Sequence, residues 1–144
     1  MKFRDDFPLP DTDWPPTQPF WAGAARGELV LPRCDRCRRF VWYPDGACRA
    51  CGATAHTWTA VSGRGRLFSW SVVHRAFIPQ LADAVPYVTG LVTIDEDPAV
   101  RLVARVVDAE PGRLRVDMPG RIVFRPLRFT GVARTVPAPF FTPE

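Results

Sequence analysis

Two short stretches, CDRC at residues 34–37 and CRAC at residues 48–51, decide the fold of this chain. Ten residues separate them, and they hold the only four cysteines in the sequence. Two thiolates spaced by two residues can bind one metal ion from a tight turn, and two such turns complete a tetrahedral four-sulfur site, which zinc favours. Because such a closed site has no open coordination position, it stabilises a fold rather than performing chemistry. We expect one structural zinc ion in a ribbon over residues 29–58, with these ligands: Cys34, Cys37, Cys48 and Cys51.

The alternatives to a zinc site are a disulfide pair, a redox-active CxxC and an iron centre. Four thiolates also suit a rubredoxin-type iron, so iron stays open beside zinc. Disulfides need an oxidising compartment, whereas residues 1–6 lack the apolar segment of a signal peptide. No apolar run is long enough to span a bilayer. We therefore expect a cytoplasmic protein that is not inserted in a membrane.

The composition fits one modest domain or two small ones, since 47% of the 144 residues are hydrophobic. Sixteen prolines argue against long helices, and five of them lie among the first nineteen residues, which predicts an extended arm. The net charge is +4, carried almost entirely by scattered arginines. A field of this size can attract DNA, RNA or the phosphates of a cofactor, and it does not choose among them.

The first 28 residues predict a proline-rich arm followed by a short helix over residues 17–28. Thr17 suits the N-cap of this helix, Pro19 its first turn and Gly27 its end. Such a short helix has little core of its own and must pack against another surface.

From residue 59 the pattern changes to short strands bounded by Gly, Pro and Asp, as in a meander. Phe68, Trp70 and Val72 alternate onto one face of the first strand. Five strands without intervening helices predict a closed OB-like barrel over residues 59–136, because closure removes exposed strand edges. The predicted strands cover residues 66–77, 87–94, 100–107, 121–129 and 132–136.

Aromatic pairs near both ends are candidates for binding a partner protein. Residues 137–144 predict a C-terminal tail outside the barrel, with two phenylalanines that would be costly to expose. The alternative for each pair is packing on the chain itself, and the sequence does not decide between them. The candidate partner-binding residues are Phe20, Trp21, Phe140 and Phe141.

The residues argue against catalysis by this chain alone. The motifs GxSxG, HExxH, GxGxxG and the P-loop are all absent, and the cysteines are used as metal ligands. His74 is the best lone candidate for a general base, but no paired nucleophile is visible, which favours a structural histidine within the first barrel strand. The acidic turn at residues 95–97 is most simply a solvated loop tip.

Several stretches resemble a family of zinc-ribbon and OB-fold proteins, formerly a domain of unknown function, that accompanies thiolase-superfamily enzymes. The resemblance covers roughly residues 17–130 and depends on the order and spacing of its motifs. Besides the two cysteine pairs, the matching stretches are Pro19-Phe20-Trp21, Gly27-Glu28-Leu29, Ser62-Gly63-Arg64-Gly65, Phe68 to Arg75, Pro86-Tyr87-Val88, Leu91-Val92 and Met118-Pro119-Gly120.

This resemblance implies a mainly β fold, with an N-terminal helical segment, a rubredoxin-like zinc ribbon and an OB barrel. It also implies a role as the accessory subunit of a thiolase-fold or lipid-transfer-like enzyme acting on acyl-CoA, such as a steroid side-chain aldolase or an acyltransferase. Members with four cysteines bind zinc, and their barrel is thought to bind or pass on acyl-CoA. Unlike longer relatives, this chain carries no fused hydratase domain.

CoA binding would need cations for its phosphates, and Arg64, Arg66 and Arg75 lie on or near the first predicted barrel strand. The hypothesis from another class is a single-stranded nucleic-acid-binding protein, because OB barrels can stack bases on aromatic side chains. No Lys/Arg stripe follows a groove in the sequence, which speaks against nucleic acid.

Overall fold

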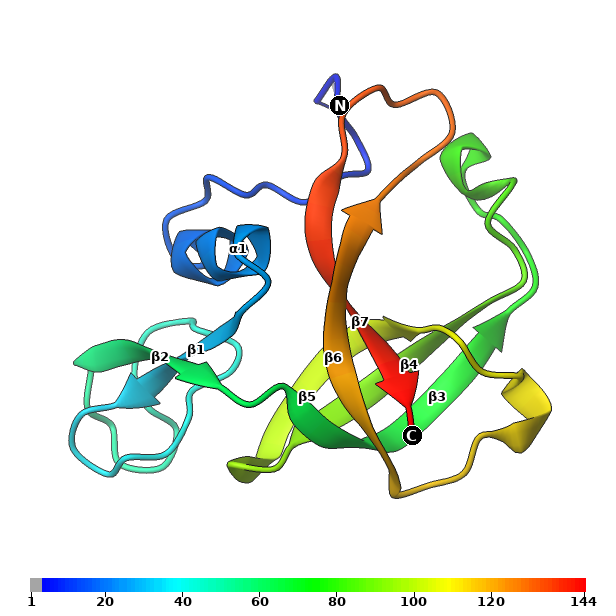
Figure 1. The fold of residues 1–144 in the computed structure, drawn as a ribbon. Coiled ribbons are helices and arrows are strands. Elements are labelled where there is room, and N and C mark those ends of the chain that lie inside the picture. Colours follow the sequence, from blue (N-terminus) through cyan, green and yellow to red (C-terminus); the bar gives the residue numbers. More distant parts are fainter. Residues whose placement is uncertain (1–3) are drawn as a thin grey trace.

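The computed structural model describes residues 4–144, so residues 1–3 of the predicted arm lie outside it. A two-stranded ribbon leads directly into a barrel, and one short helix, α1, lies beside both (Figure 1). The helix is α1 (Gln18–Ala25), and the ribbon strands are β1 (Leu29–Cys34) and β2 (His56–Val61). The barrel strands are β3 (Arg64–Val73), β4 (Tyr87–Ile94), β5 (Asp97–Val106), β6 (Met118–Leu127) and β7 (Val136–Pro143). Two 3₁₀ turns, η1 (Pro79–Leu81) and η2 (Pro111–Arg113), lie in barrel loops.

The barrel strands follow the order β3-β4-β5-β7-β6, and β3 also pairs with β6, which closes the cylinder. The pair of β5 and β7 is parallel, and the other barrel pairs are antiparallel. On β5 the alternation of buried and outward residues is the predicted one, with Val100, Leu102, Ala104 and Val106 buried. The prediction of a mainly β protein with a five-stranded OB-like barrel is confirmed.

The fifth barrel strand lies further along the chain than the sequence analysis placed it. The structure has β7 at Val136–Pro143, so the prediction of a tail over residues 137–144 is wrong. β7 pairs with β6 along its whole length, and Figure 1 shows the red β7 beside the orange β6. The prolines of this stretch do not exclude a strand, because Pro137 and Pro139 alternate with the buried Ala138 and Phe140.

A β-bulge in β3 changes which residues face the core. The pairing of β3 with β4 shifts register between Leu67 and Ser69, and an extra residue at a bulge reverses the alternation beyond it. Leu67 is fully buried and Trp70 packs against the core, whereas Phe68 is 47% exposed. The prediction that Phe68 shares one face with Trp70 and Val72 is therefore wrong.

The helix α1 is shorter than predicted, and it packs on β1 and β7. Thr17 occupies the N-cap position, but its side chain makes no capping hydrogen bond and is buried. Gly27 follows the helix with φ of 75°, a left-handed conformation that ends helices and that glycine adopts without strain. This short connection leads directly into the first ribbon strand.

Candidate metal centre and the surrounding surfaces

The two cysteine pairs form two turns with the same backbone hydrogen bonds. The N–H of Cys34 donates to the carbonyl of Arg39, and the N–H of Arg38 donates back to the Cys34 carbonyl, at 2.8 and 3.0 Å. In the second turn, the N–H of Cys48 donates to the carbonyl of Ala53, and the N–H of Gly52 donates to the carbonyl of Cys48, both at 2.7 Å. The two turns therefore share one backbone hydrogen-bonding pattern around their first cysteine.

The four sulfurs fit one tetrahedral metal ion. All four Sγ atoms lie within 4.8 Å of one another, and the Sγ atoms of Cys34 and Cys51, like those of Cys37 and Cys48, are 3.6 Å apart. A tetrahedron with metal–sulfur bonds of about 2.3 Å has edges of about 3.8 Å. The cysteines are free of disulfides. The four cysteines therefore have the arrangement that one tetrahedral metal ion requires.

The surroundings prepare one of the four thiols for metal binding. Backbone N–H donors, that of Cys37 foremost, lower the pKa of Cys34 to about 6. For Cys37 the N–H of Arg39 acts in the same direction, but burial and the neighbouring sulfurs outweigh it and raise the pKa to about 11. Only thiolates bind the metal, so a cation must displace the proton of Cys37.

A buried carboxylate joins the metal ribbon to the barrel. Asp97, at the start of β5, is 9% exposed and accepts hydrogen bonds from the backbone N–H of Phe40, at 3.2 Å, and from the Arg39 guanidinium, at 3.4 Å. The prediction of a solvated acidic turn at residues 95–97 is therefore wrong for Asp97, whereas Asp95 is exposed. A cavity of about 320 Å³ adjoins this joint, between the second cysteine turn and the start of β5.

The structure separates the four predicted partner-binding aromatics. Phe140 and Phe141 on β7 are 6% and 0% exposed, and Phe20 is 5% exposed and packs against Trp42. Their burial in this chain corrects the interpretation of these three residues as docking groups. Trp21 is half-buried and lines a surface hollow of about 250 Å³ between α1 and the start of β7, so it keeps an accessible face.

The three predicted CoA-binding arginines do not gather at one place. Arg64 and Arg66 lie at the start of β3, where they form ion pairs with Glu144 and Asp117 at 3.3 and 3.4 Å. Arg75 lies beyond the far end of β3, exposed and 6.0 Å from the ring of Phe77. His74 is exposed and follows the strand rather than lying within it.

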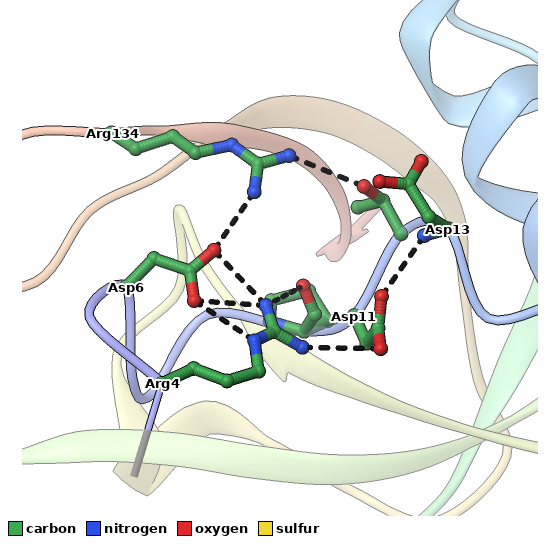
Figure 2. A network of polar contacts seen from close by, with 7 residues as sticks. Arg4, Asp6, Asp11, Asp13 and Arg134 are labelled. Atoms are coloured by element: carbon green, nitrogen blue, oxygen red, sulfur yellow. Dashed lines mark hydrogen bonds and ion pairs between the residues drawn. The ribbon is translucent and has the colours of Figure 1, made fainter.

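The N-terminal arm is held to the barrel by a polar network that the sequence analysis did not find. The carboxylate of Asp6 accepts hydrogen bonds from Arg4, at 3.0 Å, and from Arg134 in the loop before β7, at 2.8 Å (Figure 2). Arg134 also donates to the hydroxyl of Thr12. Asp6 and Arg134 are 128 positions apart, so no local pattern could reveal the contact.

Comparison with known proteins shows which family has this architecture. A model described as the ChsH2 rubredoxin-like zinc ribbon domain matches residues 21–57, and one described as the ChsH2 C-terminal OB-fold domain matches residues 58–125. The chain belongs to the ChsH2 (DUF35) family. The two matches meet within β2 (His56–Val61), the second strand of the ribbon. The resemblance stated from the sequence is thus confirmed.

Two relatives of known sequence differ in length from each other. A probable enoyl-CoA hydratase alpha subunit of Thermomonospora curvata is 33% identical over 101 residues, which are 69% of this chain and 30% of that protein. The chain thus spans less than a third of that relative. A DUF35 domain-containing scaffold protein of Methanocaldococcus jannaschii is 27% identical over 72% of each chain.

Two solved structures share the fold. A chain of the Ltp2-ChsH2(DUF35) aldolase is 26% identical, with a TM-score of 0.73 over 94% of this chain and 98% of that one. A DUF35 protein of unknown function from Sulfolobus solfataricus, 13% identical, has a TM-score of 0.60 over 91% and 87% of the two chains. Among the helices of residues 4–144, none is both long and apolar enough to cross a membrane.

Proposed function

We propose that this ChsH2-family protein is a non-catalytic accessory subunit of a thiolase-fold enzyme acting on acyl-CoA, such as a side-chain aldolase or an acyltransferase. The observation that carries the proposal is the structural match to the Ltp2-ChsH2(DUF35) aldolase over nearly the whole of both chains. The scaffold-protein name of the Methanocaldococcus relative points the same way. Steroid side chains are one substrate class that the family resemblance includes.

The site chemistry agrees with an accessory role. Within residues 4–144, the four cysteines are the one group of ligating side chains close enough to hold a metal ion, and they use all four positions of a tetrahedron. A bound zinc ion would then stabilise the ribbon and leave no position for substrate. The proposal includes a cytoplasmic location, which suits four cysteines that form no disulfide.

A direct contribution to CoA binding is the finer part of this proposal. Arg75 is the strongest of the three arginine candidates, because it is exposed and has no carboxylate partner among the described residues. Arg64 and Arg66 would first have to release Glu144 and Asp117. Trp21 is the corresponding candidate for a partner contact near α1.

Co-expression with the thiolase-fold enzymes of the source genome tests the proposal. We expect one of them to co-elute with this chain in size-exclusion chromatography and to lose acyl-CoA activity or stability when this chain is omitted. Metal analysis of the complex should find one zinc ion per chain. Failure of every candidate to co-elute, or thioester turnover by this chain alone, would refute the proposal.

A further inference from the structure

The outer surface of β3, β4 and β5 carries an apolar centre that projects to solvent among residues 4–144. Leu91 and Val103 lie opposite each other in the β4–β5 register, and Val103 is 69% exposed. A shallow groove of about 340 Å³ runs beside them, with the hydroxyl side chains of Ser69, Ser71 and Thr89 in its lining. In the barrel order β4 is the middle strand of this surface and pairs with neither β6 nor β7.

Two arginines flank this apolar centre, and each is held against an aromatic ring. The guanidinium carbon of Arg101 lies 4.1 Å from the centre of the Phe68 ring, and that of Arg105 lies 4.6 Å from the Tyr87 ring. Both distances are typical of cation–π contacts. Phe68 reaches Arg101 across β4 because the bulge in β3 turns it outward. We call the surface that these two stacked pairs form together with Leu91 and Val103 the clamp face.

The two guanidiniums lack the anions that other barrel arginines have. Within residues 4–144, no carboxylate lies at ion-pair distance from Arg101 or Arg105, and Arg101 donates only to backbone carbonyls. By contrast, Arg121 and Arg125, both on β6, pair with Glu144 and Asp108. Burial lowers the pKa of Arg105, which shows that this cation is partly removed from water. A partly desolvated cation without an anion favours association with one.

We infer that the clamp face is the docking surface for the enzyme partner, and that the partner presents an apolar side chain flanked by carboxylates. This inference rests on the proposed function and specifies its interface. Interface centres are rich in aromatic residues and arginine, and an apolar contact surrounded by charge pairs gives both affinity and register. Single-stranded nucleic acid fits less well, because guanidiniums already cover one face of both rings that would stack bases.

Substitution at the centre of the clamp face tests the inference. Val103→Glu should raise the dissociation constant for the enzyme partner by roughly 30-fold or more, since the new carboxylate would lie against the partner's apolar side chain and near its carboxylates. The matched control is Val116→Glu, because Val116 is 67% exposed and lies in the loop before β6, outside the clamp face. The control should change binding by less than about 2-fold.

A second pair of variants tests the charges without changing the apolar centre. Arg105→Glu should weaken binding about 10-fold and reduce its dependence on salt, whereas Arg115→Glu, on an exposed loop residue, should do neither. Circular dichroism and metal content should match the wild type in all four variants. If Val103→Glu fails this check it is replaced by Val103→Ser, and if Arg105→Glu fails it is replaced by Arg105→Gln. A smaller loss of binding is then expected.

The outcomes separate this inference from the proposed function. If the wild-type chain binds no thiolase-fold enzyme, the proposed function fails. If the wild type binds and Val103→Glu binds equally well, or Val116→Glu weakens binding as much, the docking surface is wrongly placed. Tight, salt-dependent binding of an oligonucleotide of about 16 nucleotides, lost in Arg105→Glu, would overturn the inference in favour of nucleic acid.

Discussion

The metal ribbon and the barrel solve the same problem of stability in different ways. The buried cluster at the cysteine turns consists of Cys34, Val41 and Cys48 among the described residues, whereas the large core cluster fills the barrel and extends to Leu29 and Leu31 of β1. Turns with so little apolar core of their own depend on a metal ion. The barrel depends instead on closure by a strand from the far end of the described chain. The difference predicts that each region can be disrupted without the other.

Removal of β7 should have the largest effect. Deleting residues 136–144 removes the fully buried Phe141 and opens the cylinder between β5 and β6, so the barrel should lose cooperative unfolding and near-ultraviolet dichroism. Metal content of the ribbon should persist. Deletion of residues 1–8, which is similar in length, is the control and should leave the cooperative transition intact. A cooperative barrel without β7 would contradict the topology.

Loss of the metal should disrupt the ribbon and spare the barrel. Cys48→Ser should abolish stoichiometric metal binding, because it removes one of the four sulfur ligands. The ribbon then loses the metal's contribution to folding, which for structural zinc is about 10–16 kcal/mol. Hydrogen exchange should then show unprotected amides over the two cysteine turns, residues 34–39 and 48–53, and protected amides over β4 and β5. Arg49→Ser, an exposed change in the same turn, is the control. Collapse of barrel protection in Cys48→Ser would show that the two regions fold as one unit.

Asp97→Asn should weaken the joint between the two regions. The neutral amide accepts hydrogen bonds from the Phe40 N–H and from Arg39 less well, and we expect a loss of about 1–3 kcal/mol in the free energy of unfolding. Chemical denaturation measures this loss, and metal content should stay at the wild-type level. The exposed neighbour Asp95 offers the matched control, Asp95→Asn. Equal effects of both changes would contradict the joint.

The smallest effect should be release of the N-terminal arm. Hydrogen bonds from Arg4 and then Arg134 lower the pKa of Asp6. A carboxylate with a lowered pKa stabilises the folded contact above its ordinary pKa of about 4, and this stabilisation is lost as the pH falls through the lowered value. Limited proteolysis should therefore cut the arm faster in acid, and Asp6→Asn should do so already at neutral pH. Asp5→Asn should behave like the wild type.

Local patterns predicted much of this protein, and long-range contacts account for what they missed. The spacing of Cys34 and Cys37 identified metal ligands because both sulfurs belong to one turn. The strand at β7 was missed because its prolines imitate an arm and because its parallel pairing with β5 leaves no local signal. The outward turn of Phe68 depends on a bulge that only the partner strand defines. Asp97 and its Phe40 partner are 57 positions apart.

The position of β7 in the chain has a consequence for biosynthesis. A ribosome releases segments in sequence order, and domains begin to fold as they emerge. The ribbon can thus fold while the barrel is still being translated, but the barrel stays open between β5 and β6 until β7 leaves the exit tunnel. During that interval the nascent protein exposes an unpaired edge of β6, to which chaperones can bind and which β7 covers in the finished molecule.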